Sequence, residues 1–282
     1  MWGGSFVAVK VALRELSPPG VVAARAALGC ALVGLAGLAR ARRSPARDAR
    51  RSDALILVLL GVLGIPVHLG LQAWALTQTS AVHSGWLVAL NPVFVVLLSV
   101  SLFGERLSPT KALGTLVGFA GAFVVITGGR AWDMALPATR GDLVMLASTL
   151  NWAAYTVIAR RLMLRRDPLE VTSRALAVGA AVAVAGYLVQ APPAEFLRAS
   201  PPTWAALAYL GLGCTGAGYL FWAAALRRVE AGTLSTLHYP QPLVTALAAA
   251  LLLGEPWGLA ATAGGVLALA GVVLVQREGA RA

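Results

Sequence analysis

The sequence predicts an all-α integral membrane protein with ten transmembrane helices, arranged as two inverted five-helix repeats. Three observations lead there: the composition, the spacing of the apolar segments and an internal repeat. Of the 282 residues, 58% are hydrophobic and only 12% are charged. A soluble domain carries roughly 25% charged residues. So few charges could not cover a water-exposed surface, whereas they suit a chain whose solvent is lipid.

Ten apolar segments are separated by short joints, many of them marked by proline and glycine. Each is long enough, or nearly so, for a helical span of about 20 residues, and too long for a barrel strand. Helix is expected because every backbone amide in hydrocarbon must be satisfied within its own segment. The predicted spans are 2–16, 19–39, 54–76, 80–103, 110–128, 141–160, 171–191, 203–226, 231–253 and 258–275.

The basic residues predict the orientation of these spans. With a cytoplasmic N-terminus, the inner loops receive sixteen Lys and Arg residues and the outer loops receive four. Basic loops remain on the cytoplasmic side, so both termini are predicted to be cytoplasmic. The net charge of +11 is thereby explained without nucleic acid as a partner. The partners expected are the lipid bilayer and a small-molecule substrate, with a homodimer as one option for assembly.

The two halves of the chain match at a constant offset of 150 residues. Asn91-Pro92 aligns with Gln241-Pro242, and Gly104-Glu105 aligns with Gly254-Glu255. Because each copy holds an odd number of helices, the second must insert upside down, as in secondary transporters. The predicted organisation is a first repeat over 1–128, a linker over 129–140 and a second repeat over 141–276. The first helix is shorter than its partner, which suggests that the true start lies upstream of Met1.

These motifs resemble the drug/metabolite transporter superfamily, specifically its ten-helix EamA-type branch. The resemblance lies in Trp2-Gly3-Gly4-Ser5-Phe6, in the run from Asn91-Pro92 through Gly104-Glu105-Arg106-Leu107 to Gly121, and in the repetition of that run from Gln241-Pro242 to Gly271. It covers nearly the whole chain. It implies a metabolite or drug carrier of the bacterial inner membrane, often an exporter of amino acids or related compounds. It also implies a cavity lined mainly by helices 3, 4, 8 and 9, with help from helices 1 and 6.

The leading hypothesis is therefore a secondary transporter that exports a small, neutral or amphipathic metabolite by alternating access. The alternative is an exchanger of organic anions or phosphorylated metabolites that uses Lys10, Arg25 and Arg174. A membrane-embedded enzyme is disfavoured because the spans offer no mid-span acidic pair and no metal motif. No cofactor and no metal are expected. The sequence contains no phosphate-binding loop of the kind that would indicate direct use of ATP.

Polar and aromatic side chains inside spans are the candidates for substrate binding, since polar groups are costly there. In helix 9, Ser235, His238, Tyr239 and Pro242 have a spacing that predicts one helical face. Interhelical packing is the competing explanation for these groups. Pro92 and Pro242 are expected to weaken their helices as hinges. The other predicted binding residues are Gln72, Trp74, Trp86, Asn91, Trp152, Tyr155, Tyr219, Trp222 and Gln241. The remaining histidines, His68 and His83, are expected to be structural.

Overall fold

A computed structural model describes residues 1–41, 51–103, 108–128, 137–190, 193–256 and 258–279. Every regular element in these ranges is helical. The chain divides into two compact units. Unit 1 comprises Met1–Ala73 and Ile158–Val229, and unit 2 comprises Trp74–Val157 and Glu230–Ala282. Each unit therefore takes segments from both predicted repeats.

Unit 1 contains the first three spans and two spans of the second half. Its elements are α1 (Ser5–Ala12), α2 (Pro18–Ala41), α3 (Arg51–Val62), the π-helical segment η2 (Leu63–Val67), most of α4 (His68–Leu76), α9 (Pro168–Gln190), α10 (Pro201–Ala208), the π-helical segment η4 (Tyr209–Ala217) and α11 (Gly218–Leu226). Two short 3-10 segments, η1 (Trp2–Gly4) and η3 (Pro193–Arg198), complete it. Within this unit, α2 packs against α9 and η4, and α3 packs against α9.

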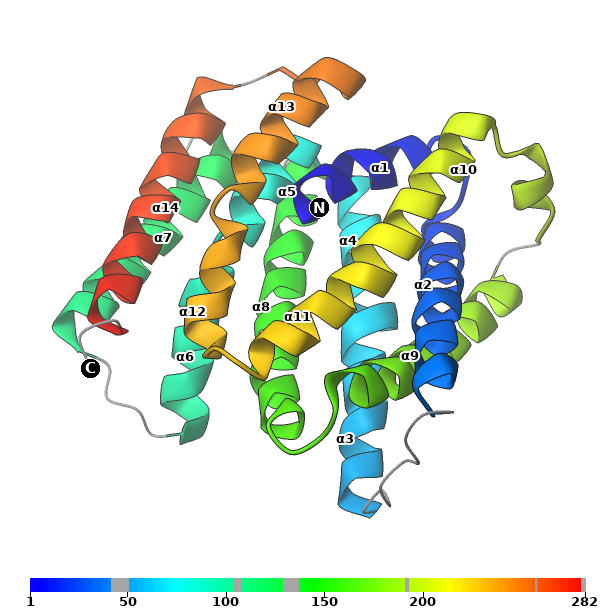
Figure 1. The fold of residues 1–282 in the computed structure, drawn as a ribbon. Coiled ribbons are helices and arrows are strands. Elements are labelled where there is room, and N and C mark those ends of the chain that lie inside the picture. Colours follow the sequence, from blue (N-terminus) through cyan, green and yellow to red (C-terminus); the bar gives the residue numbers. More distant parts are fainter. Residues whose placement is uncertain (42–50, 104–107, 129–136, 191–192, 257, 280–282) are drawn as a thin grey trace. The chain divides into compact units, whose positions relative to one another are not determined.

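Unit 2 contains the other spans. Its elements are α5 (Ala81–Val88), α6 (Asn91–Phe103), α7 (Pro109–Thr127), most of α8 (Pro137–Met163), α12 (Ala231–Ser235), the 3-10 turn η5 (Thr236–His238), α13 (Gln241–Leu253) and α14 (Leu259–Gly279). The largest helix contact in this unit joins α7 to α14, which lie side by side in Figure 1.

The element boundaries repeat at the offset found in the sequence. Six helices begin 150 residues after a counterpart: α9 after α2, α10 after α3, α11 after α4, α12 after α5, α13 after α6 and α14 after α7. The π-helical turn of Leu63–Val67 falls in the same register inside Tyr209–Ala217. The local departures from α-helix are thus duplicated along with the helices themselves.

Contacts between equivalent helices show that they run in opposite directions. A Cβ built on Gly114 would lie 2.7 Å from the carbonyl oxygen of Gly271, and one on Gly121 would lie 2.5 Å from that of Gly264. Residue numbers rise along α7 as they fall along α14, so this pair is antiparallel. Side chains larger than hydrogen would hold the two backbones apart, which is why small residues line such contacts in membranes.

Eight helices in the described residues are long and apolar enough to cross a membrane, and a shorter apolar helix covers Gln241–Leu253. The prediction of a multi-pass, all-helical membrane protein is confirmed, whereas the count of ten spans is not. The first predicted span yields only the short α1, and the ninth is interrupted between α12 and α13. Residues 129–136 of the predicted linker and the Gly104–Leu107 motif lie outside the described residues.

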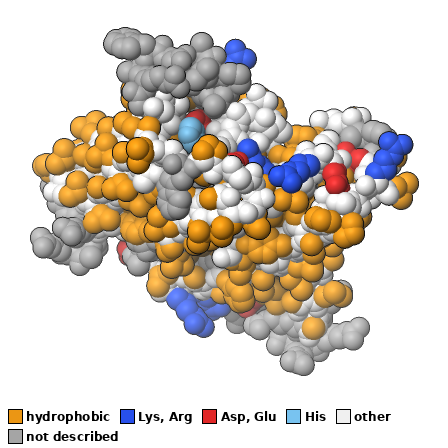
Figure 2. Space-filling model, turned by 90° about the horizontal axis from the view of Figure 1, so that it is seen from above, with side chains coloured by type: hydrophobic (Ala, Val, Ile, Leu, Met, Phe, Trp, Pro, Cys, Tyr) orange, Lys and Arg blue, Asp and Glu red, His pale blue; other side chains and the backbone are white. Residues whose placement is uncertain are grey.

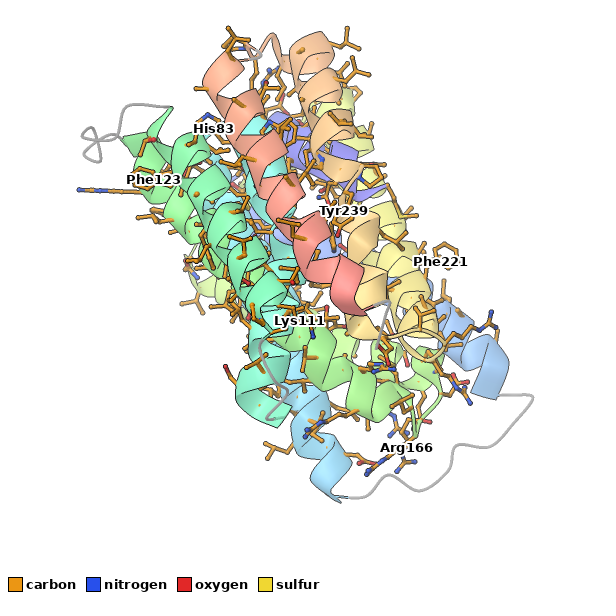
Figure 3. The ribbon with its side chains drawn as sticks, turned by 90° about the vertical axis from the view of Figure 1, so that its left-hand side faces the viewer. His83, Lys111, Phe123, Arg166, Phe221 and Tyr239 are labelled. Atoms are coloured by element: carbon orange, nitrogen blue, oxygen red, sulfur yellow. The ribbon has the colours of Figure 1, made fainter. Side chains whose placement is uncertain are left out.

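Large apolar side chains are exposed along the helices, as a lipid-facing surface requires. Leu55 is 74% exposed, Leu116 is 68% exposed and Phe221 is 64% exposed. Figure 3 shows Phe221 projecting away from the helices. On the face drawn in Figure 2, hydrophobic side chains predominate and charged ones occur in small groups. Water would not favour such a surface, whereas acyl chains would.

Candidate functional site

Two interrupted helices cross one another in unit 2. Both breaks are two-residue turns: Ala89 and Leu90 separate α5 from α6, and Tyr239 and Pro240 separate η5 from α13. Within the unit, α5 packs against α13 and α6 packs against α12. The two helices are therefore antiparallel and meet near their breaks. Interrupted helices of equivalent repeats are a frequent way of exposing polar backbone at a transport site.

The structure corrects the expected geometry around the prolines. Pro92 is the second residue of α6 and Pro242 is the second residue of α13, so neither lies in mid-helix. A proline in the first turn removes no intrahelical hydrogen bond. The predicted single face of Ser235, His238 and Tyr239 is also wrong, because α12 ends at Ser235 and a 3-10 turn follows. The hinge role of the two prolines stays a prediction.

Polar side chains near these breaks are buried, and several of their atoms have no hydrogen-bond partner. Asn91 is 0% exposed, and neither its amide nitrogen nor its amide oxygen has a hydrogen-bond partner. The Tyr239 hydroxyl and the Trp86 indole nitrogen are also buried without a partner. A buried polar group left unsatisfied costs about 1–3 kcal/mol. Buried polar groups of this kind are usually satisfied by ordered water or by a polar ligand.

The other predicted binding residues of unit 2 differ in their placement. The Oε1 atom of Gln241 accepts a 2.8 Å hydrogen bond from Nδ1 of His238, so these two side chains are brought together. Trp152 and Tyr155 are buried on α8 and stack with ring centroids 4.8 Å apart. Trp74, at the end of α4, is 43% exposed. Figure 3 shows Tyr239 midway along the helices of this unit.

In unit 1, the π-helical segments free two equivalent backbone carbonyls. The hydroxyl of Tyr219 donates to the Gly64 carbonyl at 2.5 Å, and the indole of Trp2 donates to the Cys214 carbonyl at 3.0 Å. Residues 64 and 214 are again 150 apart. A π turn arises naturally in η2, because Pro66 has no N–H to donate into the helix. Single π turns within α-helices are frequent at functional sites.

Arg25 places a cation inside unit 1. Its side chain lies on α2, its exposure is 3%, and its Nε donates to the Thr215 hydroxyl at 3.1 Å. Gly29, one turn later, allows this approach, since a Cβ there would lie 2.8 Å from Thr215 Cγ2. Among the described residues, no carboxylate forms an ion pair with Arg25. A buried guanidinium with a neutral hydroxyl partner is an unusual and costly arrangement.

The remaining unit 1 candidates lie in different settings. Gln72, Tyr219 and Trp222 are buried, and Trp222 packs on Trp2 with ring centroids 5.2 Å apart. Lys10 is half-buried on α1. Arg174 forms a 3.2 Å ion pair with Glu170 one turn earlier on α9, with a side chain that is 40% exposed. Its charge is therefore already balanced.

Two acidic residues of unit 2 bond to the start of α5: Glu255, which the sequence marks as a helix-terminus residue, and Asp142, which sequence reasoning missed. Glu255 accepts hydrogen bonds from the backbone N–H groups of Ala81 and Val82, so it caps α5 from the far end of α13. Asp142 is 0% exposed in the first turn of the apolar span Arg140–Met163, whereas the sequence led us to expect only that mid-span positions lack acidic residues. The partners of Asp142, Thr79 and His83, are distant in sequence, so no local pattern marks this residue. The described residues hold no cluster of three His, Cys, Asp or Glu side chains that could bind a metal.

Comparison with known proteins gives a consistent result. The model of the EamA-like transporter family matches residues 1–127 and 139–277. An uncharacterized transporter of Archaeoglobus fulgidus is 30% identical over 280 residues, covering 99% of this chain and 94% of the relative. A solved structure superimposes with a TM-score of 0.68 at 22% identity, covering 98% of this chain and 96% of that chain.

Two further relatives have names that specify a substrate. A probable terminal-alkyne amino-acid exporter of Streptantibioticus cattleyicolor is 30% identical over 281 residues, covering 98% of this chain and 90% of the relative. An aromatic amino acid exporter, YddG, of Ancylobacter novellus is 30% identical over 175 residues, covering 61% of this chain and 59% of the relative.

Proposed function

Because the chain belongs to the EamA-like transporter family, we propose that it is a secondary carrier that exports an amino acid or a related carboxylate by alternating access. A membrane transporter of a small molecule follows from the family itself. The finer proposal is supported by two relatives named as amino-acid exporters and by the duplicated helix breaks. The predicted cytoplasmic termini and bacterial inner-membrane location belong to the same proposal.

The observation that carries the substrate class is Arg25. A guanidinium in a membrane-spanning helix is costly unless it serves a function, and such residues commonly bind substrates or counter-ions. The planar fork of arginine matches a carboxylate through two parallel hydrogen bonds. The Nε of Arg25 is taken by Thr215, which leaves its terminal amino groups for the ligand. The α-carboxylate of a zwitterionic amino acid would supply a negative charge and two oxygen acceptors for the terminal amino groups of Arg25.

The alternative anion exchanger was expected to use three cations, and the structure gives it less support. Glu170 already neutralises Arg174, so Arg174 adds little attraction for a phosphorylated substrate. One cation facing one carboxylate fits an amino acid better than a dianion.

The test is counterflow in proteoliposomes, with labelled L-phenylalanine as the probe. Arg25→Gln is compared with Arg25→Lys, which retains the charge, and with Arg174→Gln as the matched control on another helix of unit 1. Removing one partner of a buried charge-assisted contact costs about 2–5 kcal/mol, so half-saturation should rise by about 30-fold or more in Arg25→Gln. Arg174→Gln should leave it within about twofold.

Competition provides the chemical counterpart of this test. Unlabelled phenylalanine should compete with the probe, whereas phenylalaninamide, which lacks the carboxylate, should compete poorly with the wild-type protein. In Arg25→Gln the two competitors should become nearly equivalent. Equal competition by the amide in the wild type, or unchanged half-saturation in folded Arg25→Gln, would refute the role of Arg25.

A further inference from the structure

A buried carboxylate and a partly exposed imidazole meet at one end of unit 2. Asp142, on α8, accepts a hydrogen bond from the Thr79 hydroxyl on one oxygen. Its other oxygen lies 3.0 Å from Nδ1 of His83 on α5. The Asp142 side chain is 0% exposed, whereas that of His83 is 24% exposed. Figure 3 shows His83 near the end of the helices.

The joint between α4 and α5 creates this arrangement. Ser80 caps α5 by accepting the backbone N–H of His83 at 3.0 Å, which fixes the imidazole in the first turn. Gly141 lets α8 approach the joint closely, since a Cβ there would lie 2.9 Å from the Ala75 carbonyl oxygen. Asp142 is consequently held beside Thr79 and His83.

Nearby charges do not neutralise the carboxylate. On α8, the described charged groups besides Asp142 are the exposed Arg140, two residues earlier, and Arg160 and Arg161 in the last turn. On the elements packed against α5, they are Lys111 on α7 and Glu255 after α13. Lys111 lies at the opposite end of α7 from His83 in Figure 3. Glu255 is bonded to the backbone of Ala81 and Val82 and adds negative charge. His83 is therefore the one recorded ion-pair partner of Asp142 among the described residues.

We propose that His83 and Asp142 form a proton-binding site that couples transport to the proton gradient. When Nδ1–H donates to the carboxylate, Nε2 is the atom that gains or loses the proton. Unprotonated, the pair carries a net charge of −1; protonated, it is neutral. Ionisable groups within spans commonly serve as proton relays, and imidazole changes charge in the physiological range. The exposed edge of His83 gives water access to a carboxylate that water does not reach directly.

The position of the pair suggests how the proton acts on the helix break of unit 2. His83 and Asp142 join α8 to the first half of an interrupted helix, and that half ends at the break next to Asn91. A change of charge at the start of α5 alters its attraction to α8 and thereby biases the position of the break. The predicted topology places this end outside the cell, where protons are more abundant in a respiring bacterium. Inward proton movement would then drive outward substrate movement.

The inference rests on the proposed function, and the experiment separates the two. Counterflow of labelled L-phenylalanine at equal pH on both sides tests the carrier alone. Uptake into acid-loaded vesicles in alkaline buffer, with the membrane potential clamped, tests the coupling. Wild type should accumulate the probe, with an upper limit of about tenfold per unit of pH gradient for one proton per molecule. Collapsing the gradient with an ionophore should abolish the accumulation.

The variants are His83→Gln and Asp142→Asn, with Glu255→Gln as a matched carboxylate at the same end. Both site variants should keep counterflow at equal pH and lose accumulation, whereas Glu255→Gln should retain both. The proposal would be overturned if the wild type shows counterflow at equal pH but no accumulation in a pH gradient. It would also be overturned if the site variants accumulate the probe as the wild type does. Loss of equal-pH counterflow in both site variants would assign the pair a structural role, and would also overturn it.

Discussion

Replacing Gly121 with alanine tests the contact between α7 and α14. The added Cβ would lie 2.3 Å from the backbone nitrogen of Ala268 and 2.5 Å from the carbonyl oxygen of Gly264. Ordinary van der Waals contact begins at 3.4 Å, so the two helices must separate by about 1 Å. Overpacking of this kind costs about 1–3 kcal/mol. We expect Gly121→Ala to lower the thermal-unfolding midpoint in detergent by roughly 2–12 °C.

Gly34→Ala is the matched control for this change. Gly34 also lies inside a membrane-spanning helix, α2, and no heavy atom lies within 4 Å of a Cβ built there. Alanine favours helix over glycine by up to about 1 kcal/mol, so Gly34→Ala should be neutral or stabilising. If both variants unfold at the same temperature as the wild type, the close approach of α7 and α14 is wrong. If both are destabilised equally, the effect does not come from this contact.

Two further changes follow from the described contacts. Asn91→Leu removes a buried amide without hydrogen-bond partners. We expect a higher unfolding midpoint together with a loss of counterflow, because binding groups are often retained at a cost in stability. A lower midpoint would show that Asn91 is hydrogen-bonded in the folded protein. At the surface, hydrogen bonds from Ser200 lower the pKa of Glu15. A depressed carboxyl pKa stabilises the folded state above the unfolded pKa, and this contribution disappears as pH falls through the folded value. The wild type should therefore exceed Glu15→Gln in unfolding midpoint at pH 7 and lose that advantage in acid; an advantage independent of pH would contradict it.

The repeat made much of the fold predictable. A constant offset was visible in Asn91-Pro92 and Gln241-Pro242, and the helix starts follow the same offset. The geometry at these motifs was not predictable, because a proline is compatible with both a kinked helix and the first turn of a new one. The choice depends on turns at residues 89–90 and 239–240. Pro240 marks the second turn, whereas Ala89 and Leu90 carry no turn signal. One shared face in helix 9 was accordingly the wrong inference.

Charged residues illustrate the same limit. The Arg174–Glu170 pair has i, i+4 spacing and could have been read from the sequence. The isolation of Arg25 could not, because it depends on which side chains of η4 reach α2. Asp142 was missed because its partners, Thr79 and His83, are about 60 residues away. Whether Gln72, Tyr219, Trp222 and the other predicted residues contact substrate stays a prediction.

The central claim, that this chain carries amino acids, is tested most directly by counterflow of the wild-type protein. Proteoliposomes are loaded with unlabelled L-phenylalanine, diluted into a trace of labelled L-phenylalanine at equal pH, and followed over time. We expect a transient accumulation of label that is absent from proteoliposomes without internal phenylalanine and from protein-free vesicles. Folded, monodisperse protein that shows no such accumulation with phenylalanine or with any other amino acid would contradict it.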